Sequence, residues 1–335
     1  MICDATCAPQ DIQFSTDIEL LNDAWEKAEE IIDVLHENRE DRSVTKARTY
    51  RKKARKDYLN LARKKRKTHR EIRRGIRKQI QYLRRDLAHI QDLAKDGALR
   101  SLSKRQYRNL LVANEILRQQ TEMYKNHTDR IDGRIVSLSQ PHVRPNVRGK
   151  AGRPVEFGAK ISLSVVDGMC SLDRLSWDGY NESQDLIGQI ESYRQRFGVY
   201  PESVHADKIY RTRRNLYFCA DHRIRLSGSK WGRPFKIRDE MIKVIREQRR
   251  IEHADECKRV EVEGKIGECK RRYNLGQIYE KLKPTSETAI ALGILMTTLE
   301  RILRDSFFAL LLFGTISRMR RLFVRPSGPI QRFAC

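Results

Sequence analysis

The sequence predicts an α/β structure with an all-helical, strongly basic region in front of it. Lys and Arg total 68 against 44 Asp and Glu, a formal charge of +24, and most of this excess lies in one segment near the N-terminus. Hydrophobic residues between positions 72 and 124 recur at the spacing of a helix. Beyond residue 126, short runs rich in β-branched residues alternate with helical segments, which is typical of layered α/β domains.

The composition excludes several classes of protein. A length of 335 residues with 39% hydrophobic residues allows two or three folded domains. Seven Cys, an odd number without Cys-x2-Cys pairs, argue against a disulfide framework or a zinc ribbon. Met1–Thr16 lacks the basic and apolar parts of a signal peptide, and charged residues interrupt the apolar segment Ala289–Ile316. We therefore expect a cytoplasmic protein without a membrane partner.

The basic segment Arg42–Arg85 contains 20 Lys or Arg against two acidic residues. Apolar residues recur there and beyond at steps of three and four, which predicts one buried helix face: Ile72, Ile76, Ile80, Leu83, Leu87 and Ile90. Gly97 separates this helix from a second one that continues to about Tyr124, so residues 16–125 are predicted to be helical. Because like charges repel, the segment favours a polyanionic partner, with a solvated charged face as the alternative.

A second region, residues 126–285, is predicted to form the α/β layer structure. Strands are expected over Arg134–Ser139, Phe157–Val166, Cys170–Trp177 and Ser203–Ala206, with a hairpin turn at Gly168. Helices are expected over Ser183–Phe197 and Arg238–Arg272, and residues 286–316 are expected to form a C-terminal helix that completes the core. Residues 317–335 are predicted to be a basic tail.

Two acidic residues stand out by their positions. Asp207 follows the strand Ser203–Ala206, and functional groups collect at the carboxyl ends of strands in open α/β sheets. An Asp that caps the next turn is the alternative explanation. Glu263 lies on a helix face with Arg259 and Lys270, where exposed ion pairs are the alternative. Carboxylates on different elements suit Mg²⁺-assisted phosphoryl chemistry, because this hard cation prefers oxygen ligands.

Several ordered blocks of the sequence carry a family resemblance. They are Ser137–Pro145, Val155–Lys160, Leu175–Glu182, Val204–Tyr210 and Arg225–Gly228. Arg259, Glu263 and Lys270 match the last three members of a Tyr-x2-Arg-x3-Glu-x6-Lys signature, whose Tyr position is Glu256 here. In these blocks the chain resembles the DDE transposases of bacterial insertion sequences, specifically the insertion-sequence-five group, over about residues 40 to 305. Residues 1–15 match none of the blocks and are set apart as an unplaced leader.

The resemblance implies an RNase H-like catalytic domain, a mixed sheet flanked by helices, at residues 126–285. In this family three acids hold two Mg²⁺ ions, which Mn²⁺ can replace, and Asp207 and Glu263 would be the second and third acids. The first acid is expected on the first strand, but Arg134–Ser139 contains no Asp. Asp132 is the nearest candidate for this metal ligand. The other acids considered are Asp129, as the runner-up, and Asp167 and Asp178, which are better explained by turns.

The resemblance also implies a function and a partner. We expect a transposase that acts as a homo-oligomer on double-stranded DNA, binds the ends of its own insertion sequence, and catalyses metal-dependent cleavage and strand transfer. Arg259 and Lys270 would hold phosphates of the element ends, and the helical region would contact the DNA backbone through Arg51, Lys52, Arg55, Lys64, Lys65, Arg73, Arg74 and Arg77. The alternatives are a catalytically inactive derivative that only binds DNA and, less favoured, an RNA-binding protein.

Overall fold

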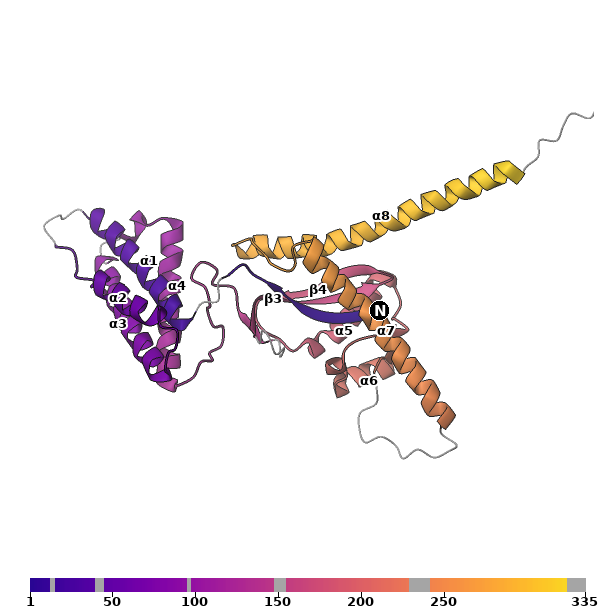
Figure 1. Cartoon of the computed structure of the whole chain (residues 1–335), viewed down its shortest axis with the longest axis horizontal. Coiled ribbons are helices and arrows are strands. Elements are labelled where there is room, and N and C mark those ends of the chain that lie inside the picture. Colours follow the sequence, from indigo (N-terminus) through magenta and orange to yellow (C-terminus); the bar gives the residue numbers. More distant parts are fainter. Residues whose placement is uncertain (13–15, 40–44, 95–97, 148–154, 229–241, 324–335) are drawn as a thin grey trace, which may run out of the picture.

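The computed structural model describes residues 1–12, 16–39, 45–94, 98–147, 155–228 and 242–323 of the chain. It is a mixed α/β structure with a helical body on one side and a sheet covered by helices on the other (Figure 1). The helical body contains α1 (Asp17–Glu37), α2 (Arg51–Ala62), α3 (His69–Leu93) and α4 (Lys104–Asn126). The start of the predicted helix at Arg238 and residues 324–335 of the predicted tail lie outside the described residues.

Local sequence explains where the long helices of the helical body begin. The Thr68 hydroxyl accepts a hydrogen bond from the Glu71 backbone, and the Glu71 carboxylate accepts one in return from the Thr68 backbone. Ser103 and Gln106 form the same reciprocal arrangement at the start of α4. The predicted apolar face of α3 is buried from Ile80 onward and packs against α1 and α4 in one hydrophobic core.

The sheet is built around β1 (Ile2–Pro9) and β3 (Val155–Val166), which pair antiparallel along the whole of β1. On the other side of β3 lies β4 (Met169–Ser176), which confirms the predicted hairpin, and β2 (Pro145–Val147) pairs with the beginning of β3. The Cys3 amide donates to the His205 carbonyl at 2.8 Å, which joins β1 to the parallel pair β5 (Ser203–Val204) and β6 (Arg225–Leu226). The strands therefore follow one another in the order β4, β3, β1, β5, β6.

The two faces of the sheet have different partners. On β3, Ile161 and Leu163 belong to a core shared with α7 (Ile242–Arg272) and α8 (Lys283–Phe323). Ser162 points to the opposite face, where its hydroxyl donates to the Asp185 carboxylate at 2.5 Å, next to α5 (Leu186–Phe197). The short helix α6 (Arg213–Asp221) completes the α5 face. Successive residues of a strand point to opposite faces, so the alternation of apolar and polar residues fixes which helices cover which face.

Two sequence predictions about the strands need correction. The segment predicted to be an unplaced leader contains β1, which lies inside the sheet (Figure 1). Consequently the helical body does not precede the α/β region but is inserted between β1 and β3. The predicted strand Arg134–Ser139 is an irregular connection, because its apolar residues are shared between two cores: Ile135 packs in the helical body and Val136 under the sheet.

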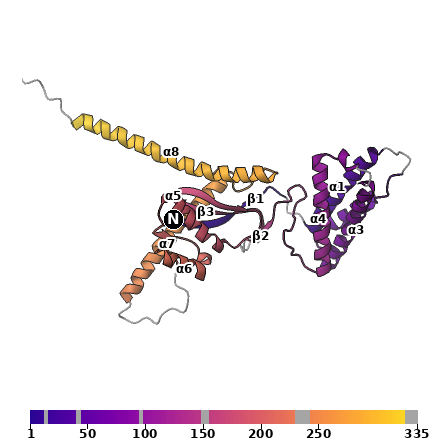
Figure 2. The same cartoon turned by 180° about the vertical axis from the view of Figure 1, so that it is seen from behind.

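The last helix, α8, is longer than predicted and extends away from the sheet, as both views show (Figures 1 and 2). Its first turns pack beneath β3 and β4 through Ile290 and Ile294. Farther along, large apolar side chains such as Leu303 and Phe313 are more than two-thirds exposed. None of the helices among the described residues is both long and apolar enough to cross a bilayer.

Candidate active site at the central strands

A pocket of about 990 Å³ lies where β1, β3 and β5 meet the middle of α7. Its carboxylates come from separate parts of the chain: Asp4, Glu156, Glu182, Asp207 and Glu263. Two cationic side chains, Lys160 and Arg259, line it as well. A pocket with more carboxylates than cations, in a protein with a formal charge of +24, indicates a local site for positively charged ligands.

Asp4 enters this pocket because of the strand alternation. It lies opposite Leu163 in the β1–β3 register, and Leu163 faces the α7 side of the sheet. The Ala5 amide donates to the Asp4 carboxylate at 2.8 Å. The pKa of Asp4 is raised to about 6, mainly by burial and also by the charges of Glu182 and Glu263, while the Ala5 hydrogen bond and the charge of Arg259 oppose the rise. A carboxylate so placed gains from a nearby cation.

Asp207 sits at the carboxyl end of the neighbouring strand, as predicted. It follows β5 after His205 and Ala206, and its carboxylate accepts a hydrogen bond from the Lys208 amide at 2.6 Å. This bond caps the single turn of helix that follows, so the structural alternative for Asp207 is realised together with its position in the pocket. Its side chain is 54% exposed, which leaves carboxylate oxygen available to a ligand.

Glu263 comes from α7 and shares a cation with Asp207. The Arg259 guanidinium lies 3.8 Å from the Asp207 carboxylate and 3.5 Å from the Glu263 carboxylate. It also contacts Glu256, the residue at the signature's Tyr position, at 3.1 Å. Glu263 is 60% exposed, whereas Arg259 is 21% exposed. Lys270, farther along α7, does not line this pocket.

The acids weighed for the first metal ligand lie elsewhere. Asp132 is exposed in the turn that follows α4, and Asp129 lines a different pocket next to Arg73. Asp167 occupies the β3–β4 turn with a positive φ of 51°, and Asp178 is 80% exposed beside Arg144. The structure thus brings Asp4, rather than Asp132, to Asp207 and Glu263. The only sequence signal for Asp4 is its place in the eight-residue strand Ile2–Pro9, whose partners are remote in sequence.

The chemistry of the donor set suits a hard divalent cation, since the three carboxylates offer only oxygen. Within the parts of the chain that the structure describes, no three His, Cys, Asp or Glu side chains are grouped closely enough to hold one ion. The Arg259 guanidinium occupies the space between Asp207 and Glu263 instead. The residues present therefore fit a divalent ion by type, with Arg259 as the group that would have to give way.

The predicted DNA contacts of the helical body fall into two sets. Arg51 is paired with Glu29 and Asp33, Arg55 with Glu26, and Lys64 with Glu71, while Arg73 donates to the Tyr124 carbonyl at 2.9 Å. The second set is exposed and forms no ion pair or hydrogen bond among the described residues: Lys52, Lys65, Arg74 and Arg77. Carboxylates therefore neutralise Arg51, Arg55 and Lys64, whereas the second set carries positive charge that no described carboxylate neutralises, and Arg73 keeps its charge but is held by a backbone carbonyl.

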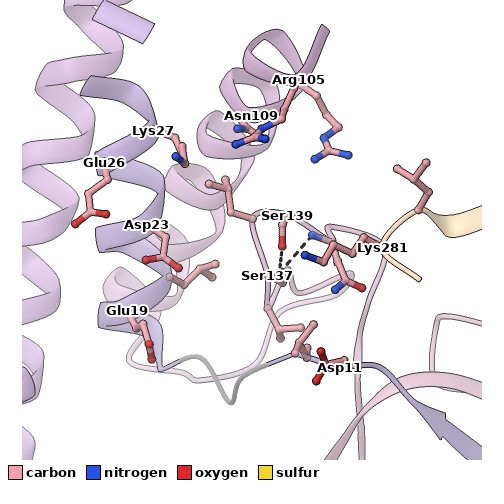
Figure 3. A pocket seen from close by; sticks show the side chains of 17 residues that line it. Asp11, Glu19, Asp23, Glu26, Lys27, Arg105, Asn109, Ser137, Ser139 and Lys281 are labelled. Carbon is pink, nitrogen blue, oxygen red and sulfur yellow. Dashed lines mark hydrogen bonds between the residues drawn. The ribbon is translucent and has the colours of Figure 1, made fainter. Parts of the chain in front are cut away.

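A second pocket, of about 570 Å³, lies at the junction between the helical body and the sheet (Figure 3). Glu19, Asp23 and Glu26 of α1 line one side, and Lys281 approaches from the other (Figure 3). The pKa of Asp23 is raised to about 6, mainly by burial and also by the charges of Glu19 and Glu26. Lys27, Arg105 and Arg108 line the pocket as well, so its acidic and cationic side chains are balanced and its charge favours neither an anionic nor a cationic ligand.

The carboxylate pocket beside the mixed sheet is a candidate active site. Residues 204–300 match the family model described as the transposase DDE domain. The match covers less than a third of the chain, and it contains Asp207, Arg259 and Glu263. It supports a DDE transposase and a function in transposition, and such domains generally use divalent metals. No curated protein and no solved structure matches the chain.

Proposed function

We propose that this protein is a transposase that uses Asp4, Asp207 and Glu263 as metal-binding acids to cleave DNA and transfer strands. The observation that carries this proposal is the pocket itself, which is lined by three carboxylates from β1, the segment after β5 and α7. The family match spans Asp207 and Glu263 but begins at residue 204, so Asp4 is assigned by geometry alone.

The strand arrangement supports an RNase H-like catalytic domain. Three antiparallel strands, β4, β3 and β1, continue into the parallel strands β5 and β6, and helices cover both faces. This mixed sheet places Asp4 on β1 beside the segment that carries Asp207 just after β5, because the Cys3 amide donates to the His205 carbonyl. Adjacent parallel strands bring side chains near their ends together, which is the requirement for two acids that share metal ions.

Each residue has a distinct part in the mechanism. Divalent ions bound here would polarise a phosphodiester and activate the attacking oxygen. Asp4 is fixed on a rigid strand by the Ala5 amide, and Asp207 is oriented by the Lys208 amide. Glu263 approaches from a helix, so its side chain can adjust to the ions. Arg259, which lines the same pocket, is placed to bind a phosphate of the DNA strand.

The DNA duplex would lie along the exposed cationic side chains of α2, α3 and the turn between them. Lys52, Lys65, Arg74 and Arg77 present uncompensated charge there, so we assign them to backbone contacts. Phosphate contacts of this kind give affinity without reading the base sequence. The proposal includes the finer expectations from sequence: membership of the insertion-sequence-five group, a cytoplasmic location, action as a homo-oligomer on element ends, and Mg²⁺ as the ion.

The alternative of an inactive DNA-binding derivative rested on the missing first acid. Asp4 lines the pocket with Asp207 and Glu263, which removes the reason for that alternative. A complete set of three carboxylates is what a two-metal site needs. We therefore favour the enzyme over the inactive derivative.

Substitution of the acids tests the proposed function. Asp4→Asn, Asp207→Asn and Glu263→Gln should each abolish Mn²⁺-dependent nicking of a DNA fragment that carries the element ends, while gel-shift binding of that fragment is retained. Asp132→Asn, a matched change in an exposed turn, should nick like the wild type. Nicking that survives in Asp4→Asn but is lost in Asp132→Asn would transfer the role of first acid to Asp132. A wild-type protein that binds the fragment but never nicks it would refute the enzyme.

A further inference from the structure

Arg259 holds an unusual position for a residue expected to contact DNA. Its guanidinium lies among three carboxylates, at 3.1 Å from Glu256, 3.5 Å from Glu263 and 3.8 Å from Asp207. The side chain is 21% exposed, so much of its surface is covered by the protein. A residue poised only for DNA phosphates would be expected to point to solvent, as Lys52 and Arg74 do on the helical body.

The charges around the pocket explain this position. The other cation that lines the pocket, Lys160, is already engaged: its ammonium lies 3.2 Å from the Glu182 carboxylate and donates to the Tyr180 carbonyl at 2.9 Å. Asp207 and Glu263 are therefore left with Arg259 as their shared cation among the described lining residues. Like charges that face each other in a pocket repel, so a bridging cation stabilises the two acids.

We propose that Arg259 is an internal counter-ion that competes with the metal for Asp207 and Glu263, an inference that rests on the proposed function. A guanidinium stays protonated at any physiological pH, so this competition cannot be relieved by deprotonation. Binding of a divalent ion must displace the guanidinium from both carboxylates. The displaced guanidinium is then free for a DNA phosphate, so occupation of the metal site and engagement of the DNA strand favour each other.

This coupling has a definite thermodynamic consequence. Arg259 lowers the affinity of the free protein for a divalent ion, and a DNA phosphate that draws Arg259 away raises that affinity by the reciprocal effect. A residue that only held the DNA would leave metal affinity unchanged in the absence of DNA. Metal binding by the free protein therefore separates the two roles.

The experiment is a titration of the full-length protein with Mn²⁺ in the absence of DNA, with free Mn²⁺ measured by electron paramagnetic resonance. Arg259→Gln should bind Mn²⁺ more tightly than the wild type, by on the order of 5-fold, the lower end of typical coupling, because the ion pairs are partly exposed. Arg250→Gln is the matched control on the same helix: Arg250 is 79% exposed and pairs with Glu247 at 2.8 Å, so the same loss of charge should leave Mn²⁺ affinity unchanged.

Further variants make every outcome decisive. Arg259→Lys keeps the charge but lacks the planar fork that spans two carboxylates, so its Mn²⁺ affinity should lie between those of the wild type and Arg259→Gln; this variant serves if Arg259→Gln does not fold. Equal or weaker binding by both Arg259 variants, with binding still abolished by Asp207→Asn, would overturn the counter-ion role and leave the proposed function intact. Absence of Mn²⁺ binding in every protein would overturn the metal site itself.

Discussion

A buried carboxyl group in the helical body gives the sharpest prediction about stability. Asp86 on α3 is fully buried, and neither of its carboxylate oxygens has a well-formed hydrogen bond. Its pKa is raised from 3.8 to about 8, mainly by burial and also by the nearby charge of Glu29, against the opposing effects of Arg85, Arg51 and the indole of Trp25. The substitution Asp86→Asn removes this titration and nearly preserves the shape of the side chain.

The sign of the effect follows from proton linkage. Between about pH 4 and pH 8 the folded protein holds the Asp86 proton and the unfolded chain has released it, so stability falls as the pH rises through this window. With one pKa unit worth about 1.4 kcal/mol, the loss between pH 5 and pH 7 is about 3 kcal/mol. Asp86→Asn should therefore be stabilised relative to the wild type by about 3 kcal/mol more at pH 7 than at pH 5.

Urea unfolding at the two pH values measures this difference. Trp25 packs in the same core as α3, and its fluorescence reports on the helical body once Trp177 and Trp231 are replaced by Phe in both proteins. Gln81→Ala is the control, because Gln81 is exposed on the same helix and has no titrating group, so its replacement should change stability alike at both pH values. A difference between Asp86→Asn and the wild type that is equal at pH 5 and pH 7 would refute the reasoning.

Two further predictions concern DNA binding and the position of β1. Replacing Arg74 and Arg77 by Gln should weaken binding to any duplex and flatten the dependence of log K on log salt by about 0.9 per lost contact. Arg51→Gln should flatten it less, because Arg51 is already paired with two α1 carboxylates. Fluorescence anisotropy at several salt concentrations measures this slope, and equal effects would contradict the division into two sets. Gly158→Ala should lower the melting temperature by several degrees and weaken Mn²⁺ binding, because a Cβ there would lie 2.0 Å from the Ala8 carbonyl oxygen and push β1 away from β3. A variant whose calorimetric melting temperature and Mn²⁺ affinity are both unchanged would contradict this packing.

The elements that could be predicted from sequence are those specified by neighbouring residues. The buried face of α3 follows from a spacing of three and four residues, and the hairpin of β3 and β4 follows from the turn at Gly168, whose φ is +78°. The position of Asp207 at the carboxyl end of a strand could also be predicted from neighbouring residues, because the strand that it follows is a local apolar run. Local patterns failed for Arg134–Ser139, since a run of apolar residues looks the same whether it pairs as a strand or is shared between two cores.

Asp4 could not be found in this way because its setting is entirely non-local. β1 pairs with β3 and contacts His205, partners that are more than 140 residues away along the chain. A short segment of alternating residues is stabilised as a strand only by pairing with such partners, and no residue pattern within Ile2–Pro9 indicates which partners these are. The family match also begins after this strand, so neither periodicity nor resemblance reaches the first acid.

The two ends of the helical body, where the chain enters it from β1 and leaves it toward β3, are held together by side-chain hydrogen bonds. Arg134, where the chain returns toward the sheet, donates to Asp17 at the start of α1 at 2.6 Å across 117 positions. Gln120 of α4 donates to the same carboxylate at 2.8 Å, so the entry and the exit of the helical body are tied at one point. A closed base of this kind lets a whole domain interrupt the chain between two paired strands without separating them. The sequence alone therefore indicated basic helices followed by a catalytic region. In the structure, the catalytic region also includes β1, with Asp4, which precedes those helices in the chain.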